Sequence, residues 1–295
     1  MTKSTMTTMK VRPLAGCIGA EVVGVDLREA LADATLGEIR RLLDERLVVF
    51  FPGQALDDEQ HLAFALRFGE PYIHPIGRTA GRTSVGVEHI VDSVEHPPYQ
   101  DKWHTDVSFD PHPPVYGTLR AIDIPSRGGD TVWASMYAAY DALSTVMQEV
   151  VAPLSAVHDM GSAAAFVTKA GADLVARTRE AFPGAEHPVV GVHPSTGRSF
   201  LNVNKEFTAR IVGMHADESA AVLRLLTDQV TNPNHQVRYS WTPGDFVIWD
   251  ERVTQHFGVA DYLPQRRPFL AHRCRTRLPD RAVGSAWHHH DPLRC

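Results

Sequence analysis

Three side chains in this sequence have the chemistry of metal ligands: His104, Asp106 and His256. His104 and Asp106 are two residues apart, so in an extended segment both point to the same face and can reach one ion. Such a pair is frequent by chance, and alone it is better explained by a surface histidine beside a solvated aspartate. His256 follows an apolar segment far along the chain, and closure of a β-barrel would bring it to the pair. Two histidines and one carboxylate then form the facial triad of non-haem Fe(II) oxygenases, which leaves positions for a bidentate cosubstrate and O2.

Two further residues have side chains suited to an anion-binding site. Arg267, in Gln265-Arg266-Arg267, is suited to a bidentate hold on a carboxylate, and Thr131 offers a hydroxyl donor. Each has an ordinary explanation, as a surface charge and as a strand threonine. Together with a metal triad they favour a site for a dicarboxylate cosubstrate.

The elements that must position these residues are mainly strands. Short apolar segments separated by Gly and Pro turns are typical of a β-sandwich or barrel. The predicted strands cover residues 47–51, 117–124, 131–133, 189–193, 200–203 and 245–249. A few helices decorate this β-core. They are predicted to begin at Thr35 with a capping box to Glu38, to run from Asp57 to a stop at Gly69, and to cover residues 136–143 and 217–230.

The chain of 295 residues is predicted to form a single domain, 1–295, in which about 162–182 is a helical insertion and about 279–295 a C-terminal tail containing His288–His290. The formal net charge is −6 and the pI near 6.2, so we expect no nucleic-acid partner. No segment approaches the length of a signal peptide core or a membrane span, and three scattered cysteines do not suggest disulfides. We therefore expect a cytoplasmic protein without membrane contact.

Several stretches resemble the TauD/TfdA-type family of Fe(II)- and α-ketoglutarate-dependent dioxygenases. The resemblance runs from about residue 10 to about 278. Its matching stretches are FGEPYIHP (68–75), WHTDVSF (103–109), PSRGGDTVWAS (125–135), HPVV (187–190), FLNVNKEFTARIVG (200–213) and PGDFVIWDERVTQHFGVADYLPQRR (243–267).

The resemblance implies a double-stranded β-helix, a jelly-roll or cupin-like barrel decorated with helices. His104, Asp106 and His256 match the iron ligands, and Thr131 and Arg267 match the residues that hold the distal carboxylate of α-ketoglutarate. Related halogenases lack the carboxylate ligand, so the presence of Asp106 implies hydroxylation. Iron, α-ketoglutarate and O2 would be required, and a homo-oligomer (dimer or tetramer) is expected by analogy.

The substrate pocket departs from the family pattern. His74 and Phe207 match pocket residues, but Gly77 stands where a Tyr is expected and Gln100 where an Asn is expected. The family's second arginine should lie four residues after Arg267, whereas the chain has Arg273 two residues later. We hypothesise that a bulge near Pro268 lets Arg273 bind a sulfonate or sulfate; the alternative is that this anion site is lost.

The resemblance predicts hydroxylation of a small organic acid, in the first place taurine or a related alkylsulfonate, with release of sulfite, aldehyde, succinate and CO2. An alkyl sulfate ester or a carboxylic acid is the alternative substrate. Two other functions use the same scaffold: a zinc hydrolase, against which Thr131 and Arg267 count, and a non-catalytic jelly-roll binding protein, against which the complete triad counts.

Overall fold

The computed structural model describes residues 9–83, 86–94, 98, 101–161, 167 and 170–275. Gln100, the start of the predicted insertion at 162–182 and the predicted tail at 279–295 with its histidine run lie outside the described residues.

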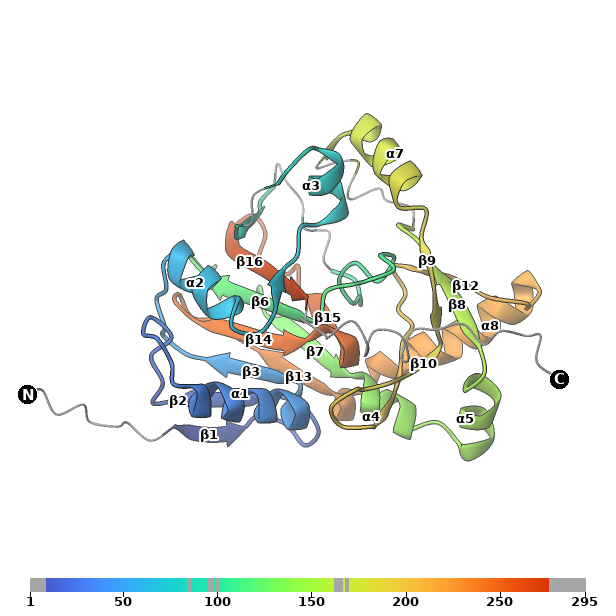
Figure 1. Cartoon of the computed structure of the whole chain (residues 1–295), viewed down its shortest axis with the longest axis horizontal. Coiled ribbons are helices and arrows are strands. Elements are labelled where there is room, and N and C mark those ends of the chain that lie inside the picture. Colours follow the sequence, from blue (N-terminus) through green and yellow to red (C-terminus); the bar gives the residue numbers. More distant parts are fainter. Residues whose placement is uncertain are drawn as a thin grey trace, which may run out of the picture.

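The larger sheet contains eight of the strands that the structure describes and forms one wall of the molecule (Figure 1). Its order is β1-β2-β3-β14-β6-β16-β4, and β5 pairs with β16 beside this path. Every pairing is antiparallel except that of β2 with β3. The strands are β1 (Lys10–Pro13), β2 (Ala20–Val23), β3 (Val48–Phe51), β4 (Glu70–Pro71), β5 (Glu88–Asp92), β6 (Tyr116–Ala121), β14 (Phe246–Asp250) and β16 (Arg267–Arg275).

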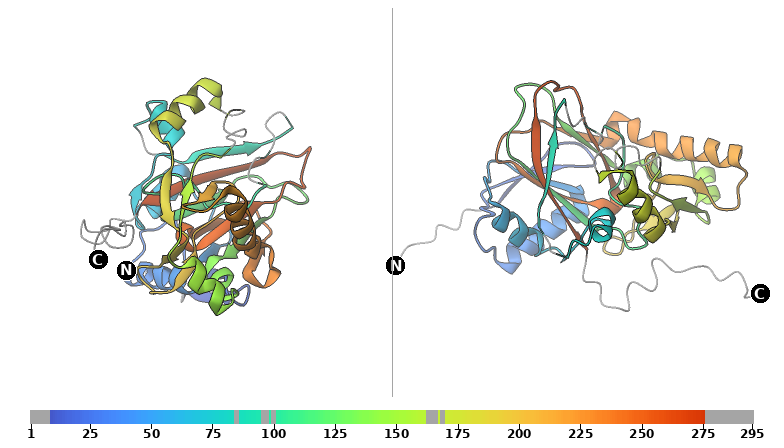
Figure 2. Two further views of the ribbon diagram at one scale, coloured as in Figure 1. Left: turned by 90° about the vertical axis from the view of Figure 1, so that its right-hand side faces the viewer. Right: turned by 90° about the horizontal axis from the view of Figure 1, so that it is seen from above.

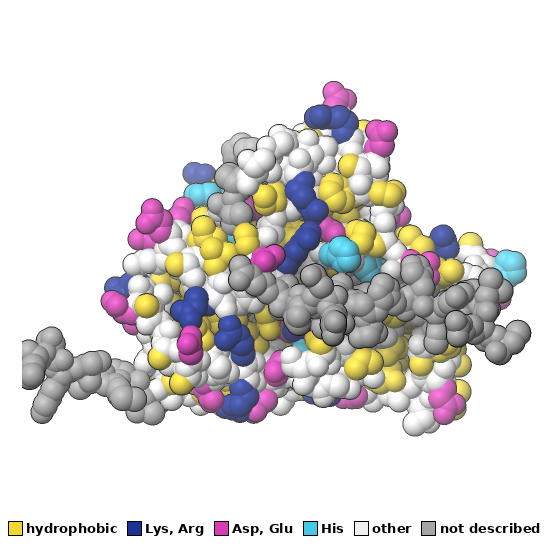
Figure 3. Space-filling view, in the orientation of Figure 1, with side chains coloured by type: hydrophobic (Ala, Val, Ile, Leu, Met, Phe, Trp, Pro, Cys, Tyr) yellow, Lys and Arg dark blue, Asp and Glu magenta, His cyan; other side chains and the backbone are white. Residues whose placement is uncertain are grey.

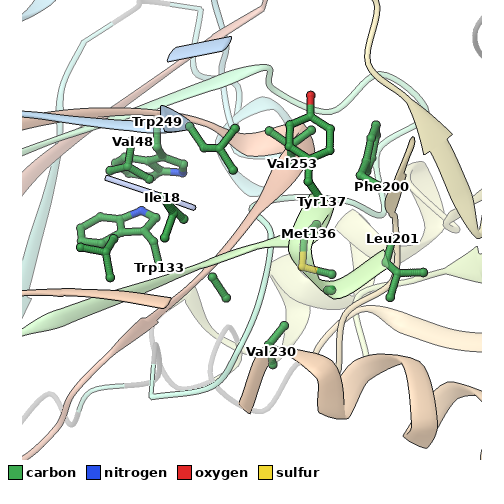
Figure 4. Packing of buried hydrophobic residues seen from close by; sticks show 14 of the residues in the cluster. Ile18, Val48, Trp133, Met136, Tyr137, Phe200, Leu201, Val230, Trp249 and Val253 are labelled. Carbon is green, nitrogen blue, oxygen red and sulfur yellow. The ribbon is translucent and has the colours of Figure 1, made fainter. Parts of the chain in front are cut away.

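A smaller sheet, in the order β13-β7-β15, packs against the larger one. It consists of β7 (Thr131–Ser135), β13 (Gln236–Tyr239) and β15 (Thr254–Gly258). The core between the sheets is aromatic: Trp133 from β7 and Trp249 from β14 meet with their ring centroids 5.7 Å apart, next to Ile18 and Val48 (Figure 4). The predicted strand before His256 is thus buried on both faces, as its apolar sequence indicated.

Two small sheets extend the molecule on one side. One has the order β12-β8-β9, from β12 (Thr208–Ile211), β8 (Ser155–His158) and β9 (Ala185–Pro188). The other pairs β10 (Val190–Val192) with β11 (Ser199–Leu201). The β-rich architecture with peripheral helices agrees with the predicted fold class.

The helices lie around the sheets rather than between them (Figures 1 and 2). They are α1 (Asp33–Arg46), α2 (Asp58–Ala65), α3 (Pro75–Thr79), α4 (Met136–Asp141), α5 (Thr145–Val151), α7 (Ala172–Ala181) and α8 (Ala216–Thr227), with 3-10 turns η1 (Asp228–Thr231), η2 (Pro233–His235) and η3 (Glu251–Val253). Helices α3 and α7 are far apart in sequence but pack together, side by side in both figures. In the described part of the chain, no helix is both long and apolar enough to span a bilayer.

Two predicted helix boundaries need correction. The first helix begins at Asp33, not Thr35, and its N-cap Ala32 makes no side-chain cap; Glu38 pairs with Arg41 instead of capping. An acidic residue in the first turn favours this earlier start through the helix dipole. The second helix has the predicted cap at Asp57 but ends at Ala65. Gly69 is not its stop signal: a Cβ there would lie 1.9 Å from the carbonyl oxygen of Arg275, so glycine permits close approach to β16.

Candidate active site

The three candidate metal ligands converge at one place between the sheets. His104 and His256 form an isolated antiparallel bridge, in which the amide of His256 donates to the carbonyl of His104 over 2.8 Å and the reverse bond measures 3.2 Å. The candidate ligand atoms of His104, Asp106 and His256 all lie within 4.8 Å of one another. Backbone pairing between β15 and the segment before Asp106 therefore sets the spacing of the two imidazoles.

The protonation states of this cluster fit a divalent cation. The Nδ1 atom of His104 lies 2.7 Å from the carbonyl of Lys102, so it donates there and leaves Nε2 as the free ligand atom. Burial, and secondly the neighbouring His104, lower the pKa of His256 to about 3, which keeps that imidazole neutral. Its Nδ1 is buried and has no hydrogen-bond partner among the described residues. Two imidazoles and a carboxylate are the donors that Fe(II) takes in a facial triad.

Asp106 stays ionised although it is buried. Burial raises the pKa of its carboxyl, but the positive charge of Arg273, together with the hydrogen bond from its guanidinium, outweighs that effect and lowers the pKa. The Nε of Arg273 donates to Asp106, and its Nη1 donates to Glu88 over 2.8 Å. Arg273 thus links a candidate iron ligand to a second carboxylate.

Glu251 contacts the backbone of Asp106, and no pattern in the sequence indicated this role. Its Oε2 accepts from the amide of Asp106 over 3.2 Å, and the side chain is fully buried. Burial first, and the charge of Asp106 second, raise the pKa of Glu251 well above its usual range. Asp250, the last residue of β14, accepts hydrogen bonds from His193 and Arg252.

Arg267 and Thr131 lie together as the cosubstrate prediction requires. The Nη2 of Arg267 donates to Thr131 Oγ1 over 2.8 Å, and its Nε donates to the carbonyl of Gly129 over 2.8 Å. Arg267 is 3% exposed, yet no carboxylate in the described part of the chain forms an ion pair with it. A buried cation without a counter-ion is a strong attractor for an anion. A narrow cavity is lined by this pair together with Asp106 and His256, so the arginine and the candidate metal ligands face one space.

Three of the predicted substrate residues line a larger cavity beside the candidate metal ligands. This cavity has a volume of about 660 Å3, and His74, Phe207 and Arg273 line it together with His104 and Asp106. His74 caps α3, with Nδ1 accepting from the amide of Ile76 over 3.2 Å. Burial, and next the charge of Arg273, lower the pKa of His74 to about 4, so its ring is neutral. Gly77 also lines the cavity, whereas Gln100 lies outside the described residues.

The predicted bulge after Arg267 is wrong. Strand β16 pairs with β5 from Arg267 to Ala271 and with β6 from Phe269 to Cys274, and both registers are unbroken. Pro268 is tolerated because it starts the strand's pairing region rather than interrupting a ladder at its centre. Arg273 therefore lies six residues along a regular strand, on the same face as Arg267, roughly 20 Å away by strand rise.

Sequence reasoning missed several charged residues of the larger cavity. Arg82, Glu88, Lys102 and Glu206 all line it. Lys102 Nζ lies 3.1 Å from Glu206 Oε2, so these two lining residues form an ion pair. These residues belong to no spacing pattern, and only the folded chain brings them to one surface.

Comparison with known proteins agrees with the family resemblance seen in the sequence. The family model for the taurine catabolism dioxygenase TauD, TfdA family, matches residues 10–275. An alkylsulfatase of Acinetobacter baylyi is 37% identical over 268 residues, covering 88% of this chain and 82% of that protein. An α-ketoglutarate-dependent sulfate ester dioxygenase of Pseudomonas putida is also 37% identical, covering 88% and 87%.

Solved structures agree with these relatives. A taurine dioxygenase from Burkholderia xenovorans superposes with a TM-score of 0.75 at 34% identity, covering 90% of both chains. AAD-2, in complex with Mn(II) and N-oxalylglycine, superposes with a TM-score of 0.77 at 27% identity, covering 92% of this chain and 99% of that one. These likenesses confirm the predicted fold class.

Proposed function

The chain belongs to the TauD/TfdA family of α-ketoglutarate-dependent dioxygenases, and on that premise we propose that its substrate is an alkyl sulfate ester. The enzyme uses Fe(II), α-ketoglutarate and O2. His104, Asp106 and His256 would hold the iron, and Thr131 and Arg267 the distal carboxylate of α-ketoglutarate. Bound iron, with α-ketoglutarate and O2, supplies hydroxylation of a C–H bond coupled to decarboxylation of α-ketoglutarate to succinate and CO2.

The observation that carries the choice of substrate is the size and lining of the larger cavity. A molecule as small as taurine would leave most of the roughly 660 Å3 unfilled, whereas pockets of this volume take larger organic ligands. Many of its walls are apolar, which suits an alkyl chain: Ile76, Ala80, Val87, Ile90, Val107, Ala170, Leu174 and Phe207. The names of the two relatives at 37% identity, an alkylsulfatase and a sulfate ester dioxygenase, support the same class.

The residues of this cavity would orient the substrate and exclude water. His74, Phe207 and Arg273 are proposed to contact the substrate, with the carbon that bears the ester oxygen near His104 and Asp106. Hydroxylation of that carbon yields a hemiacetal ester. This hydroxylated carbon then becomes the aldehyde carbonyl as its bond to the sulfate oxygen breaks, and sulfate leaves with the proton of the new hydroxyl group. The products are an aldehyde, sulfate, succinate and CO2.

The test is O2 uptake by the Fe(II)-loaded protein with α-ketoglutarate and one added substrate. The panel contains hexyl sulfate, hexanesulfonate, taurine and hexanoate. We expect the strongest stimulation, with one sulfate released per succinate formed, from hexyl sulfate. Stronger stimulation by taurine or hexanesulfonate, with sulfite released, would contradict this proposal and would identify sulfonates as the substrate class. The variant Asp106→Ala serves as the control, because loss of the carboxylate should remove bound iron, measured by metal analysis, together with all O2 uptake.

A further inference from the structure

Positive charges in the larger cavity differ in how far they are already neutralised. Arg273 donates to both Asp106 and Glu88, so two carboxylates share its charge. Lys102 is paired with Glu206 at 3.1 Å. Arg82 also lines the cavity, and among the described residues no carboxylate forms an ion pair with it. Arg82 is exposed to solvent, and of the three cations at this surface it is the one with which no carboxylate of the described residues pairs.

The local chain path holds Arg82 at the cavity. Gly81, with φ +80°, turns the backbone after α3, and the amide of Arg82 then donates to the carbonyl of Gly77 over 2.9 Å. The side chain passes directly across Gly77: a Cβ added there would lie 3.3 Å from Cδ of Arg82. Arg82 and Arg273 also line a neighbouring cavity of about 250 Å3, so both approach the same space.

Gly77 occupies the position where the family resemblance predicts a tyrosine. A large side chain at this position would take the space that Arg82 now crosses, because even a methyl group there is in tight contact with it. The glycine at residue 77 therefore leaves the space through which the side chain of Arg82 reaches the cavity. Figure 3 shows Lys and Arg side chains among apolar ones on the face where α3 lies.

We propose that Arg82 binds the anionic group of the substrate, while Arg273 acts mainly as a positioning residue that ties Asp106 to Glu88. This inference rests on the proposed function, since it assigns the sulfate group of that substrate to a residue. A monoanion that enters the cavity is attracted by the uncompensated cation, whereas binding to Arg273 requires competition with Glu88. Arginine is suited to the task because its planar fork donates two parallel hydrogen bonds to sulfate oxygens.

The test measures binding without turnover. Protein loaded with Mn(II) and N-oxalylglycine is titrated calorimetrically with hexyl sulfate, and with 1-hexanol as a neutral ligand of the same chain length. We expect Arg82→Gln to raise the Kd for hexyl sulfate about tenfold and to leave the Kd for 1-hexanol within twofold. Arg82→Lys should restore part of the affinity. Gly77→Ala should weaken hexyl sulfate binding severalfold, because the new methyl group displaces Arg82.

Arg224→Gln is the matched control, because Arg224 is an exposed arginine on α8 that does not line the cavity. A Kd for hexyl sulfate in Arg82→Gln within twofold of that in Arg224→Gln would overturn the assignment of Arg82. An equal loss for hexyl sulfate and 1-hexanol would also overturn it, because the side chain would then only shape the pocket. If hexyl sulfate fails to stimulate O2 uptake by the wild-type enzyme, the proposed function fails, which is a separate result.

Discussion

The two ends of strand β16 hold buried arginines in opposite electrostatic conditions. Arg267 hydrogen-bonds to Thr131 and to a backbone carbonyl, and no carboxylate of the described residues pairs with it. Arg273, six residues later on the same face, is held between Asp106 and Glu88. A buried cation without a partner is prepared for an anionic ligand, whereas a paired cation fixes the groups around it. The same residue type on one strand therefore has two roles, and the surrounding carboxylates decide which.

The largest expected effect is at the Arg267 end. Replacing Arg267 by Leu removes the cation that we expect to hold the distal carboxylate of the cosubstrate. Buried charge-assisted contacts of this kind are worth about 2–3 kcal/mol, so the Kd for α-ketoglutarate should rise about 30- to 160-fold. Calorimetric titration of the Mn(II)-loaded protein with α-ketoglutarate measures it.

The neighbouring Arg266 provides the control, because it is exposed while Arg267 is buried. Arg266→Leu should bind α-ketoglutarate with the wild-type Kd. If Arg267→Leu binds as tightly as Arg266→Leu, the unpaired arginine does not hold the cosubstrate, and the contrast between the two ends of β16 has no functional meaning.

A smaller effect is expected at the Arg273 end, and in the opposite direction. Glu88 lines the substrate cavity and shares Arg273 with Asp106. The variant Glu88→Gln removes the competing negative charge while keeping a group of the same shape. We expect the KM for hexyl sulfate to fall about three- to fivefold, because a partly exposed charge pair is worth about 1 kcal/mol or less. A rise in KM would mean that Glu88 is needed to hold the cavity in shape, rather than competing for the cation.

A further prediction concerns His158, a buried histidine at the end of β8, away from the two arginines of β16. His158 Nδ1 lies 3.0 Å from Ser108 Oγ, which also accepts from Asn204. Burial, and then His187, lower the pKa of His158 to about 3. The unfolded chain therefore takes up this proton first as the pH falls below about 6.5, so the free energy of unfolding decreases between pH 6.5 and 3.

Substitution should remove this share of the pH dependence. His158→Gln is expected to unfold more easily at pH 7, but between pH 6.5 and 4 its free energy of unfolding should fall less steeply, by up to about 1.4 kcal/mol per pH unit. Urea denaturation at several pH values measures this, with His112→Gln as a control for replacing an exposed histidine. Equal slopes in all three proteins would show that His158 is protonated in the folded state over this range.

The sequence by itself determined the chemistry nearest the metal. His104 and Asp106 are neighbours in an extended segment, His256 follows a strand that is recognisably buried, and Thr131 and Arg267 lie on strands of the core. Strand periodicity and burial are local properties, so the pattern of residue types predicted which side chains share a strand face. The meeting of His256 with the distant pair was expected from closure of a barrel and from the family resemblance. The capped start of α2 at Asp57 was predictable for the same reason, because a capping box involves only neighbouring residues.

The tertiary structure alone decided the charge balance around the substrate. Whether β16 contains a bulge depends on its partners β5 and β6, which lie far away in sequence. Which distant side chains reach one another decides the raised pKa of Glu251 and the sharing of Arg273 between Asp106 and Glu88. It also leaves Arg82 without a paired carboxylate among the described residues. Electrostatic interactions depend on distance in space and on burial, and neither is encoded in the spacing of residues along the chain.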